Sequence, residues 1–288
     1  MIRRYRPEDS NLDLSLGIQC GPHQFVEPGF ELHTHEFVEM VVVLGGRGLH
    51  LSSYGDYEIG AGDVFVIHRD VAHGFTESRG MKIVNFMITE SFLDDTGRWL
   101  RRLPGYHSLF VLEPVYRCRQ KIRNRLRLSA SELKPVARLV NSFTEELVNK
   151  RPAYQAIVIA HWQMLLAHLC RVFSDVADGE APFSPLADTI AFMELHYAEK
   201  LSLRDLARRA HLSPNHFIRM FRQYYGMTPA RYVNDLRIDR ARELLRGTER
   251  SVTDIALSCG FGDSNYFARA FRKVEGLNPR AYRKSPDE

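Results

Sequence analysis

LSLRDLARRAHLSPNHFIRMFRQYYGMTPARYV, residues 201–233, decides the fold, because the chain repeats this stretch once. Residues 250–283 read RSVTDIALSCGFGDSNYFARAFRKVEGLNPRAYR. Self-similarity at a fixed period indicates that one supersecondary unit is used twice. Each copy predicts two short helices around a tight turn, which together form a helix-turn-helix unit. The matching pairs are Asp205 with Asp254 and Ala207 with Ala256, 49 positions apart, and Phe221 with Phe271, Arg222 with Arg272, Gly226 with Gly276, Pro229 with Pro279 and Tyr232 with Tyr282, 50 positions apart.

The two copies also share signals for where their helices begin and which face they bury. Ser202 with Asp205, and Ser251 with Asp254, have the spacing of a capping box with Asp in place of Glu. In the first copy, Ser213 before Pro214 predicts the start of the second helix. An apolar stripe on each second helix is expected to pack on the scaffold. The stripes are Phe217, Met220, Phe221 and Tyr224, and then Phe267, Ala270, Phe271 and Val274.

The opposite faces of the two second helices carry side chains suited to DNA. Arg binds guanine through two hydrogen bonds, Asn suits adenine, and Ile or Ala can contact a thymine methyl group. TPARYVNDLRIDRARELLRG, residues 228–247, predicts a long helix between the units, closed by Gly247. Such a helix would place the two recognition helices about 34 Å apart, the distance between successive major-groove faces. The outward residues are Asn215, Ile218, Arg219 and Arg222, then Ser264, Asn265, Ala268, Arg269 and Arg272.

The positive charge of the chain is concentrated beside the repeats. The formal net charge is +4, and from Leu186 onward there are 18 Lys and Arg residues against 13 Asp and Glu residues. The preceding 185 residues have 21 against 22. A basic C-terminal third suits a surface that binds phosphate, although charged faces often only solvate a protein. The sequence therefore favours a protein that binds double-stranded DNA.

The spacing of the cysteines and the length of the apolar runs indicate the cellular compartment of the protein. The four cysteines, Cys20, Cys118, Cys170 and Cys259, have neither zinc-type nor redox-type spacing, which predicts reduced, packed thiols. The N-terminus has no apolar region typical of a signal peptide. No apolar run approaches the roughly 20 residues that a membrane span requires. We expect a cytoplasmic protein that does not contact a membrane.

The first two thirds of the chain change from strand signals to helix signals. Residues 17–90 alternate in polarity between glycine-rich turns, which predicts a small β-barrel or sandwich. Residues 91–176 have helical periodicity, and DGEAPFSP at 178–185 reads as an exposed linker. The predicted class is α+β. Its parts are a β-barrel at 1–90, a helical linker or dimerisation segment at 91–177, the linker at 178–185 and an all-α DNA-binding domain at 186–288.

One helical segment leaves two interpretations open. PAYQAIVIAHWQMLLAHLCRVF, residues 152–173, is apolar on more than one face. A single helix has difficulty burying several faces against a small domain, so contact with a second copy in a homodimer is one interpretation. Packing inside the monomer is the other.

The C-terminal third of the chain resembles a known protein family. LSPNHFIRMFRQYYGMTPARYV and DIALSCGFGDSNYFARAFRKVEGLNPRAYR make residues 186–284 similar to the DNA-binding domain of the AraC/XylS family of bacterial transcription regulators. The resemblance implies that Arg222 and Arg272 hold phosphate, and that RNA polymerase and a second copy are partners. Gly262 stands where the family often has a capping serine, so we expect Asp263 to cap that helix. The implied base-contacting residues are Asn215, His216, Ile218, Arg219, Ser264, Asn265, Ala268 and Arg269.

The N-terminal part resembles the cupin-like, sugar-sensing domain of the same family, rhamnose-responsive members especially. HTHEFVEMVVVLGGRG (33–48) and GAGDVFVIHRDVAHGF (60–75) carry this resemblance. Equal strand parity predicts that His33, His35 and Glu39 point to one face of the sheet, and His73 follows a later turn. The spacing H-x-H-x3-E…H is typical of metal-binding cupins, and this donor set suits Fe, Mn or Zn. Here His68-Arg69-Asp70 replaces the usual P-x-G before the last histidine.

These residues support three interpretations of the sensor. We expect an interior pocket without metal or cofactor that hydrogen-bonds a polyhydroxylated effector through His33, His35, Glu39, His73 and Arg47. A metal site made by the three histidines and Glu39 is the second interpretation, and buried histidines satisfied by neighbouring strands are the third.

The function expected from the sequence is a ligand-responsive transcription regulator that is not an enzyme. A sugar or sugar derivative would act as the effector, and the protein would activate a sugar-utilisation operon. A metal-dependent cupin enzyme fused to a DNA-binding domain is the alternative from another class. A purely architectural DNA binder with an empty barrel is a third.

Overall fold

The computed structural model describes residues 2–10, 12, 15–24, 30–120, 126–176 and 184–285. The chain forms two compact units, Met1–Ala187 and Asp188–Glu288. Residues 178–183 of the predicted linker, and the side chain of Cys118, lie outside the described part. Cys20, Cys170 and Cys259 are buried free thiols, as expected for packed cysteines.

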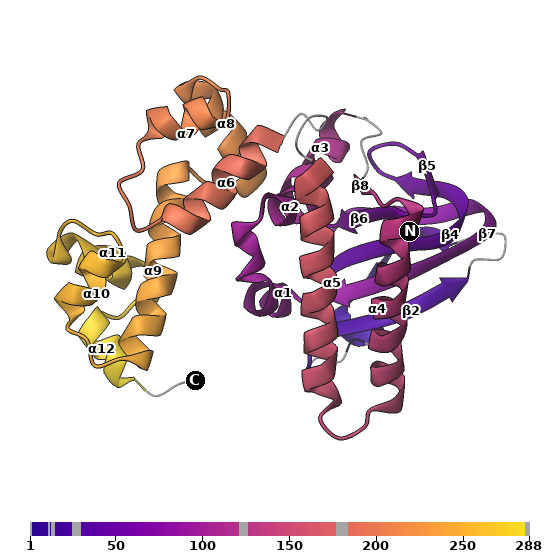
Figure 1. Cartoon of the computed structure of the whole chain (residues 1–288), viewed down its shortest axis with the longest axis horizontal. Helices are drawn as coiled ribbons and strands as arrows, with labels where there is room; N and C mark the ends of the chain where they lie inside the picture. Colours follow the sequence, from indigo (N-terminus) through magenta and orange to yellow (C-terminus); the bar gives the residue numbers. More distant parts are fainter. Residues whose placement is uncertain are drawn as a thin grey trace. The chain divides into compact units, whose positions relative to one another are not determined.

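The first unit is built on one curled, eight-stranded sheet, a half-barrel (Figure 1). Its path is β1-β3-β7-β4-β6-β8, with β2 also paired to β7 and β5 to β4. The long strands β4 and β7 run antiparallel along most of their length, and bulges interrupt their register between Val43 and Leu49. The strands are β1 (Arg3–Tyr5), β2 (Ile18–Gln24), β3 (Phe30–His35), β4 (Val38–Ser52), β5 (Tyr57–Gly60), β6 (Asp63–Ile67), β7 (His73–Ile88) and β8 (Leu126–Arg127).

Helices cover one face of this sheet, and β4 shows how the sequence arranges both faces. Side chains alternate along a strand. Val41 and Val43 point into the half-barrel, where they pack with Phe65 and Phe75. Met40 and Val42, one residue out of phase, join the core that the helices share with the sheet. This arrangement, together with the all-helical second unit, confirms the predicted α+β class with a cupin-like half-barrel.

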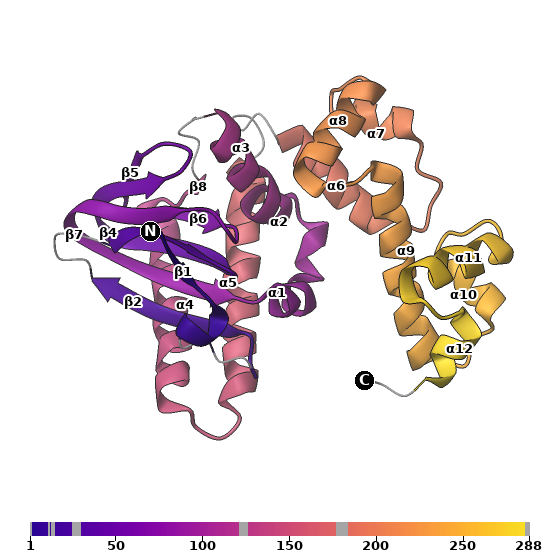
Figure 2. The ribbon, with the colours of Figure 1, turned by 180° about the vertical axis from the view of Figure 1, so that it is seen from behind.

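The helical segment of the first unit packs on the sheet. The two longest helices, α4 (Ala130–Asn149) and α5 (Tyr154–Val176), lie against the same face in both ribbon views (Figures 1 and 2). A capping box between Ser129 and Glu132 begins α4. The shorter elements are η1 (Pro7–Ser10), α1 (Glu90–Gly97), η2 (Leu100–Arg102), α2 (Pro104–His107), η3 (Ser108–Leu112) and α3 (Glu113–Gln120).

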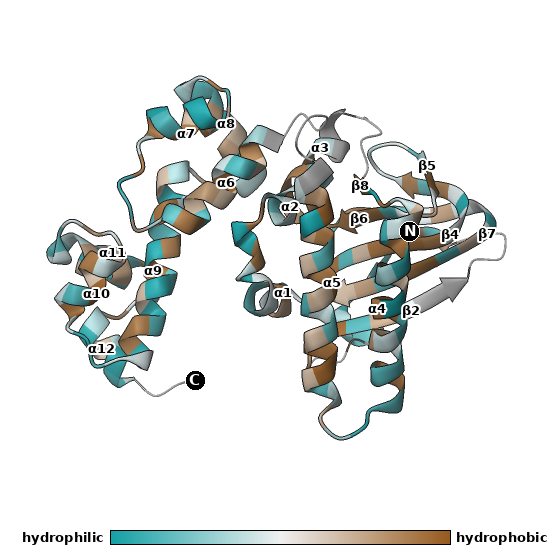
Figure 3. Ribbon diagram, in the orientation of Figure 1, coloured by the Kyte–Doolittle hydropathy of each residue, from teal (hydrophilic) through white to brown (hydrophobic). Residues whose placement is uncertain are grey.

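Helix α5 buries much of its apolar surface inside the monomer. Trp162, Leu166 and Leu169 are fully buried in the core shared with the sheet, and Figure 3 shows hydrophobic residues along both. Its apolar composition therefore does not require a second copy. The expectation that no segment reaches membrane length was wrong, because Tyr154–Ser174 is long and apolar enough by composition. That stretch is a core helix, since it packs against α4, α2 and the sheet.

The second unit is all helical within the described residues. It contains α6 (Ser184–His196, which begins just before the boundary), α7 (Leu203–Arg209), α8 (Pro214–Tyr225), α9 (Pro229–Gly247), α10 (Val252–Ser258), α11 (Ser264–Glu275) and α12 (Pro279–Lys284). Helices α7 and α8 form the first helix-turn-helix, and α10 and α11 form the second. Each pair corresponds to one copy of the sequence repeat.

Candidate DNA interface and sensor site

The second helix of each helix-turn-helix, α8 or α11, is built in the same way. The Ser213 hydroxyl accepts a hydrogen bond from the backbone N–H of His216, and α8 begins at the next residue, Pro214. Asp263 accepts the N–H groups of Asn265 and Tyr266, at 3.0 and 3.1 Å, before α11. The expected takeover of the cap by Asp263 beside Gly262 is confirmed. Both helices have 12 residues, and each ends at a left-handed glycine, Gly226 or Gly276.

The first helix of each pair begins with a closely related cap. Ser202 accepts the N–H of Asp205, and its hydroxyl donates to the carboxylate of that residue at 2.6 Å. Ser251 and Asp254 repeat the arrangement at 2.7 Å. The carboxylate of Asp is too short to complete the reciprocal bond that Glu makes to the backbone in a capping box. It binds the serine hydroxyl instead.

The apolar stripes hold both recognition helices on the scaffold. Phe217 and Phe221 of α8 are fully buried, as are Phe267 and Phe271 of α11. The Tyr232 ring meets Phe221 at 5.3 Å, and the Tyr282 ring meets Phe271 at 5.2 Å, both edge to face. Val274 was wrongly predicted to complete the second stripe, because it is 49% exposed. It occupies the position of Tyr224, but a valine side chain reaches less far than a tyrosine ring.

The outward faces of α8 and α11 keep their arginines free of internal partners. Arg219, Arg222, Arg269 and Arg272 are exposed and make no ion pair within the described residues. Four other arginines of this unit, by contrast, form ion pairs with carboxylates in the described structure: Arg208 with Asp205, Arg231 with Asp235, Arg240 with Glu243, and Arg242 with Asp239 and Glu275. Of the other predicted base-contacting residues, Asn215 and Asn265 are exposed, and His216, Ile218, Ser264 and Ala268 are half-buried.

Helix α9 connects the two helix-turn-helix units. Its 19 residues correspond to a length of about 28 Å at 1.5 Å per residue. Arg242 of α9 donates to Glu275 at the end of α11, and Asn234 donates to the Tyr266 hydroxyl at 3.2 Å. The helix ends at Gly247, as predicted, although Gly247 does not adopt the left-handed conformation that is common at helix ends. The next residue, Thr248, is extended, and its hydroxyl donates to the carbonyl oxygen of Leu244.

Four predicted sensor residues meet inside the half-barrel. His33 and His35 come from β3, Glu39 from β4 and His73 from the start of β7. Nε2 of His35 and Nε2 of His73 lie 3.2 and 3.3 Å from Oε2 of Glu39. The rings of His33 and His73 are 4.2 Å apart. We call these four residues the histidine–glutamate cluster, and none of them is more than 8% exposed.

The backbone fixes the orientation of the three imidazoles. Each ring places Nδ1 against a backbone carbonyl oxygen two residues away along the chain. Since a carbonyl oxygen only accepts, Nδ1 must donate, and Nε2 is then the atom turned toward the cluster. The acceptors for His33, His35 and His73 are the carbonyl oxygens of Glu31, Phe37 and Val71, at 3.0, 2.8 and 3.2 Å.

Burial and mutual attraction shape the charges of the cluster. Burial lowers the pKa of His33 to about 4, and the neighbouring His73 adds to this effect. For Glu39, burial alone would raise the pKa. The attraction of His73 and His35 outweighs burial and holds the pKa of Glu39 well below its ordinary range. The cluster therefore places an ionised carboxylate among imidazoles in an apolar interior.

Arg47 does not join the histidine–glutamate cluster. His50, which the sequence did not single out, lies beside the cluster instead. The Arg47 side chain is exposed on β4, opposite Gly60 and Arg79 in the register. His50 is 1% exposed, and its ring stacks 5.8 Å from that of His73. His50 differs from Glu39 in strand parity, but the bulges of β4 turn it inward. The glycines of GGRG were the signal for such a change of register.

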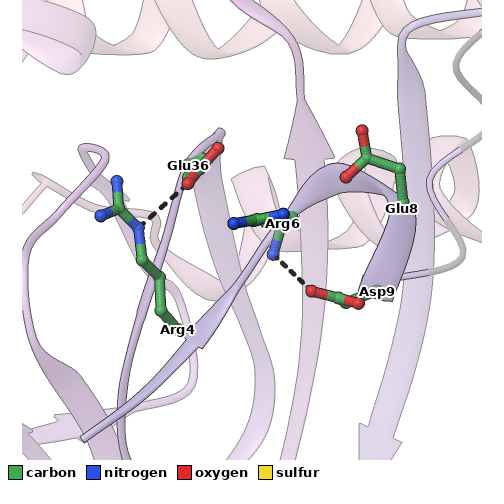
Figure 4. A pocket seen from close by; sticks show the side chains of 5 residues that line it. All are labelled: Arg4, Arg6, Glu8, Asp9 and Glu36. Carbon is green, nitrogen blue, oxygen red and sulfur yellow. Dashed lines mark hydrogen bonds and ion pairs between the residues drawn. The ribbon is translucent and has the colours of Figure 1, made fainter.

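A polar hollow lies on the other side of β3 from the cluster. Arg4, Arg6, Glu8, Asp9 and Glu36 line it (Figure 4). Arg4 pairs with Thr34 in the register, and Thr34 points away from the face of His33 and His35 because side chains alternate. Nε of Arg4 lies 3.1 Å from Glu36, and the backbone N–H of Arg6 donates to Asp9. Among the residues that line this hollow, Arg4 and Glu36 form an ion pair.

Two helix-turn-helix units with unpaired, outward arginines define the second unit as a DNA-binding domain. Comparison with known proteins agrees: residues 206–285 match the family described as a helix-turn-helix domain, and residues 17–166 match the AraC-like ligand binding domain. The chain therefore belongs to the AraC family of helix-turn-helix regulators.

Individual relatives are similar along nearly the whole chain. The chain is 32% identical over 258 residues to the HTH-type transcriptional activator RhaS of Escherichia fergusonii, covering 90% of this chain and 89% of that protein. It is 28% identical over 264 residues to the HTH-type transcriptional activator RhaR of Mannheimia succiniciproducens, covering 89% and 88%. Among solved structures, the DNA-binding domain of AdpA in complex with a target DNA is 34% identical, with a TM-score of 0.34, over 34% of this chain and 89% of that chain.

Proposed function

We propose that the protein activates transcription of sugar-utilisation genes when a small effector binds its sensor unit. The chain is a DNA-binding transcription regulator and not an enzyme, as its family and relatives indicate. The observation that carries the proposal is the matched pair of recognition helices, α8 and α11, with Arg219, Arg222, Arg269 and Arg272 exposed and unpaired in the described structure. Unpaired guanidinium groups are available to guanine edges and phosphates.

The residues of these helices divide into two proposed roles. Asn215, His216, Ile218 and Arg219 of α8 contact bases, as do Ser264, Asn265, Ala268 and Arg269 of α11. Arg222 and Arg272, one helical turn further along, hold phosphate. The division rests on helix geometry, because the N-terminal residues of a recognition helix lie deepest in the major groove.

The effector is proposed to be a sugar or sugar derivative that enters the half-barrel. His33, His35, Glu39 and His73 supply polar groups on its interior face, and Arg47 would contribute from the rim. The relatives named as transcriptional activators support activation as the direction of control. An effector regulates only if it binds the DNA-competent arrangement more tightly than the other arrangement.

The assembly is proposed to be a cytoplasmic homodimer that contacts RNA polymerase at the promoter. Met164 of α5 and Val148 of α4 are 57% and 76% exposed, and they provide apolar surface for a second copy. An activator must also contact the transcription machinery.

Selection of bound sites from random DNA, with and without a panel of monosaccharides, tests the proposal. We expect one enriched sequence with two recognition segments, and enrichment that changes with one sugar. Failure to enrich any sequence would contradict sequence-specific regulation. A thermal-shift screen separates an architectural DNA binder from a sensor, because an effector that binds the folded state must raise its stability.

A further inference from the structure

The histidine–glutamate cluster contains more buried polar atoms than the protein pairs. Nε2 of His35, Nε2 of His73 and Oε1 of Glu39 are buried and have no hydrogen-bond partner in the described part of the chain. The contacts of both Nε2 atoms with Oε2 of Glu39 are close but lack hydrogen-bond geometry. A buried polar atom without a partner costs about 1–3 kcal/mol. Three together in an apolar interior indicate a missing partner.

The chemistry of these atoms says what that partner is. Because Nδ1 of each imidazole donates to a backbone carbonyl, Nε2 is the ring atom that can offer a lone pair to a ligand. The carboxylate oxygens of Glu39 offer further lone pairs. A metal cation accepts electron pairs from several of these atoms at once and offsets the charge of the carboxylate, which a neutral hydroxyl group does not do. Histidines that bind metals usually donate their other ring N–H to a carbonyl or carboxylate, and all three imidazoles here already do so.

The spacing of the donors also suits one ion. One donor atom each from His33, Glu39 and His73 lie within 4.8 Å of one another. Ligand atoms that surround a metal ion at about 2.0–2.2 Å lie roughly 3 to 4.4 Å from each other, so only a small closure is required. These donors come from three different strands, and burial restrains all of them.

We propose that His33, Glu39 and His73, with His35 as the fourth donor, bind one divalent first-row transition metal ion in the sensor half-barrel. Imidazole with one carboxylate suits Zn, Fe, Mn, Co or Ni. Calcium and magnesium prefer sites made of oxygen alone. The ion does not exclude the proposed effector, since hydroxyl oxygens can occupy coordination positions that the protein leaves open. The inference does not depend on the identity of the effector.

The test uses the full chain purified without an affinity tag, because a histidine tag binds the same metals. The protein is stripped with a chelator, titrated with Zn²⁺ and separately with Co²⁺, and analysed by elemental mass spectrometry. We expect one equivalent per chain, the visible absorption bands of Co²⁺ in a nitrogen–oxygen site, and a higher unfolding temperature for the sensor unit. Protein that retains no stoichiometric metal and shows no Co²⁺ bands would overturn the proposal.

Two variants locate the ion. Glu39→Gln keeps the shape of the side chain but removes its charge, so we expect metal affinity to fall by more than the roughly 10–100-fold that loss of an outer hydrogen-bond partner costs. His50→Gln is the matched control, because His50 is buried 5.8 Å from His73 but is not in the donor set, and it should retain one equivalent. Equal loss in both variants would refute the assigned ligands. If Glu39→Gln does not fold, the titration of the unchanged protein decides.

DNA binding is measured on the same stripped and loaded samples. Sequence-specific binding by protein that takes up no metal would overturn the metal site and leave the regulator standing. Stoichiometric metal without sequence-specific DNA binding would support the metal site and contradict the proposed function.

Discussion

Arg242 in α9 donates from Nε to Oε1 of Glu275 at 2.7 Å, which ties the last turn of the second recognition helix to the connecting helix. Glu275 is mostly buried, whereas Arg242 is about one third exposed, so solvent screens the pair in part. We expect Arg242→Ala to lower the free energy of unfolding by about 1 kcal/mol. It should also weaken DNA binding, because α11 loses one of its tethers. Urea unfolding and fluorescence anisotropy with operator DNA measure the two effects.

Arg240→Ala is the matched control for this prediction. Arg240 lies on the same helix and carries the same charge, but its ion pair with Glu243 stays within α9. If both variants weakened DNA binding equally, general loss of positive charge would explain the effect, and the tether would have no special role.

Arginines one turn apart on a recognition helix should respond differently to salt. Arg219→Ala or Arg269→Ala should cost ~1–3 kcal/mol of binding and relax base preference at one position. Arg222→Ala should weaken binding to all sequences and reduce the salt slope by about 1. Binding titrations at several salt concentrations, with operator and scrambled DNA, make the comparison. Equal salt slopes in both kinds of variant would refute the division into base and phosphate contacts.

The sequence predicted the second unit well because its signals are local. A cap such as Ser213 or Asp263 acts within three residues, and the period that aligns Phe217 with Phe221 belongs to one helix. The face shared by His35 and Glu39 followed from strand alternation in the same way. Val274 shows the limit of such reasoning, since the pattern gives a direction but not the distance that a side chain must span.

Other features depend on contacts between distant segments, which no local pattern encodes. β1 and β8 have three and two residues, too few for a periodic signal, and they exist because β3 and β6 offer free edges. His50 was missed because bulges reverse the parity of β4. The burial of α5 depends on how much surface the sheet and α4 present to it. The sequence of α5 alone does not contain that quantity.

Asp263 rather than Gly262 should determine the stability of the start of α11. Asp263→Ala removes the acceptor for two backbone N–H groups, which should cost about 1 kcal/mol of unfolding free energy. Gly262→Ser should change little, because its added side chain meets open space and the cap is already made. Chemical unfolding of both variants measures the difference. A large gain from Gly262→Ser would show that the cap is incomplete.

His107 should make the stability of the first unit depend on pH. Burial lowers the pKa of His107 from 6.5 to about 3, so the folded protein keeps it neutral while the unfolded chain protonates it. Between these values the unfolded state binds one more proton, and the contribution to stability is complete above about pH 6.5 and is lost as pH falls. The loss is about 1.4 kcal/mol per pH unit. The neutral side chain of His107→Gln cannot titrate, so its unfolding free energy should fall by about 2 kcal/mol less than that of the unchanged protein between about pH 7 and pH 5. Urea unfolding at the two pH values provides the comparison, and parallel losses in both proteins would mean that His107 is protonated in the folded state.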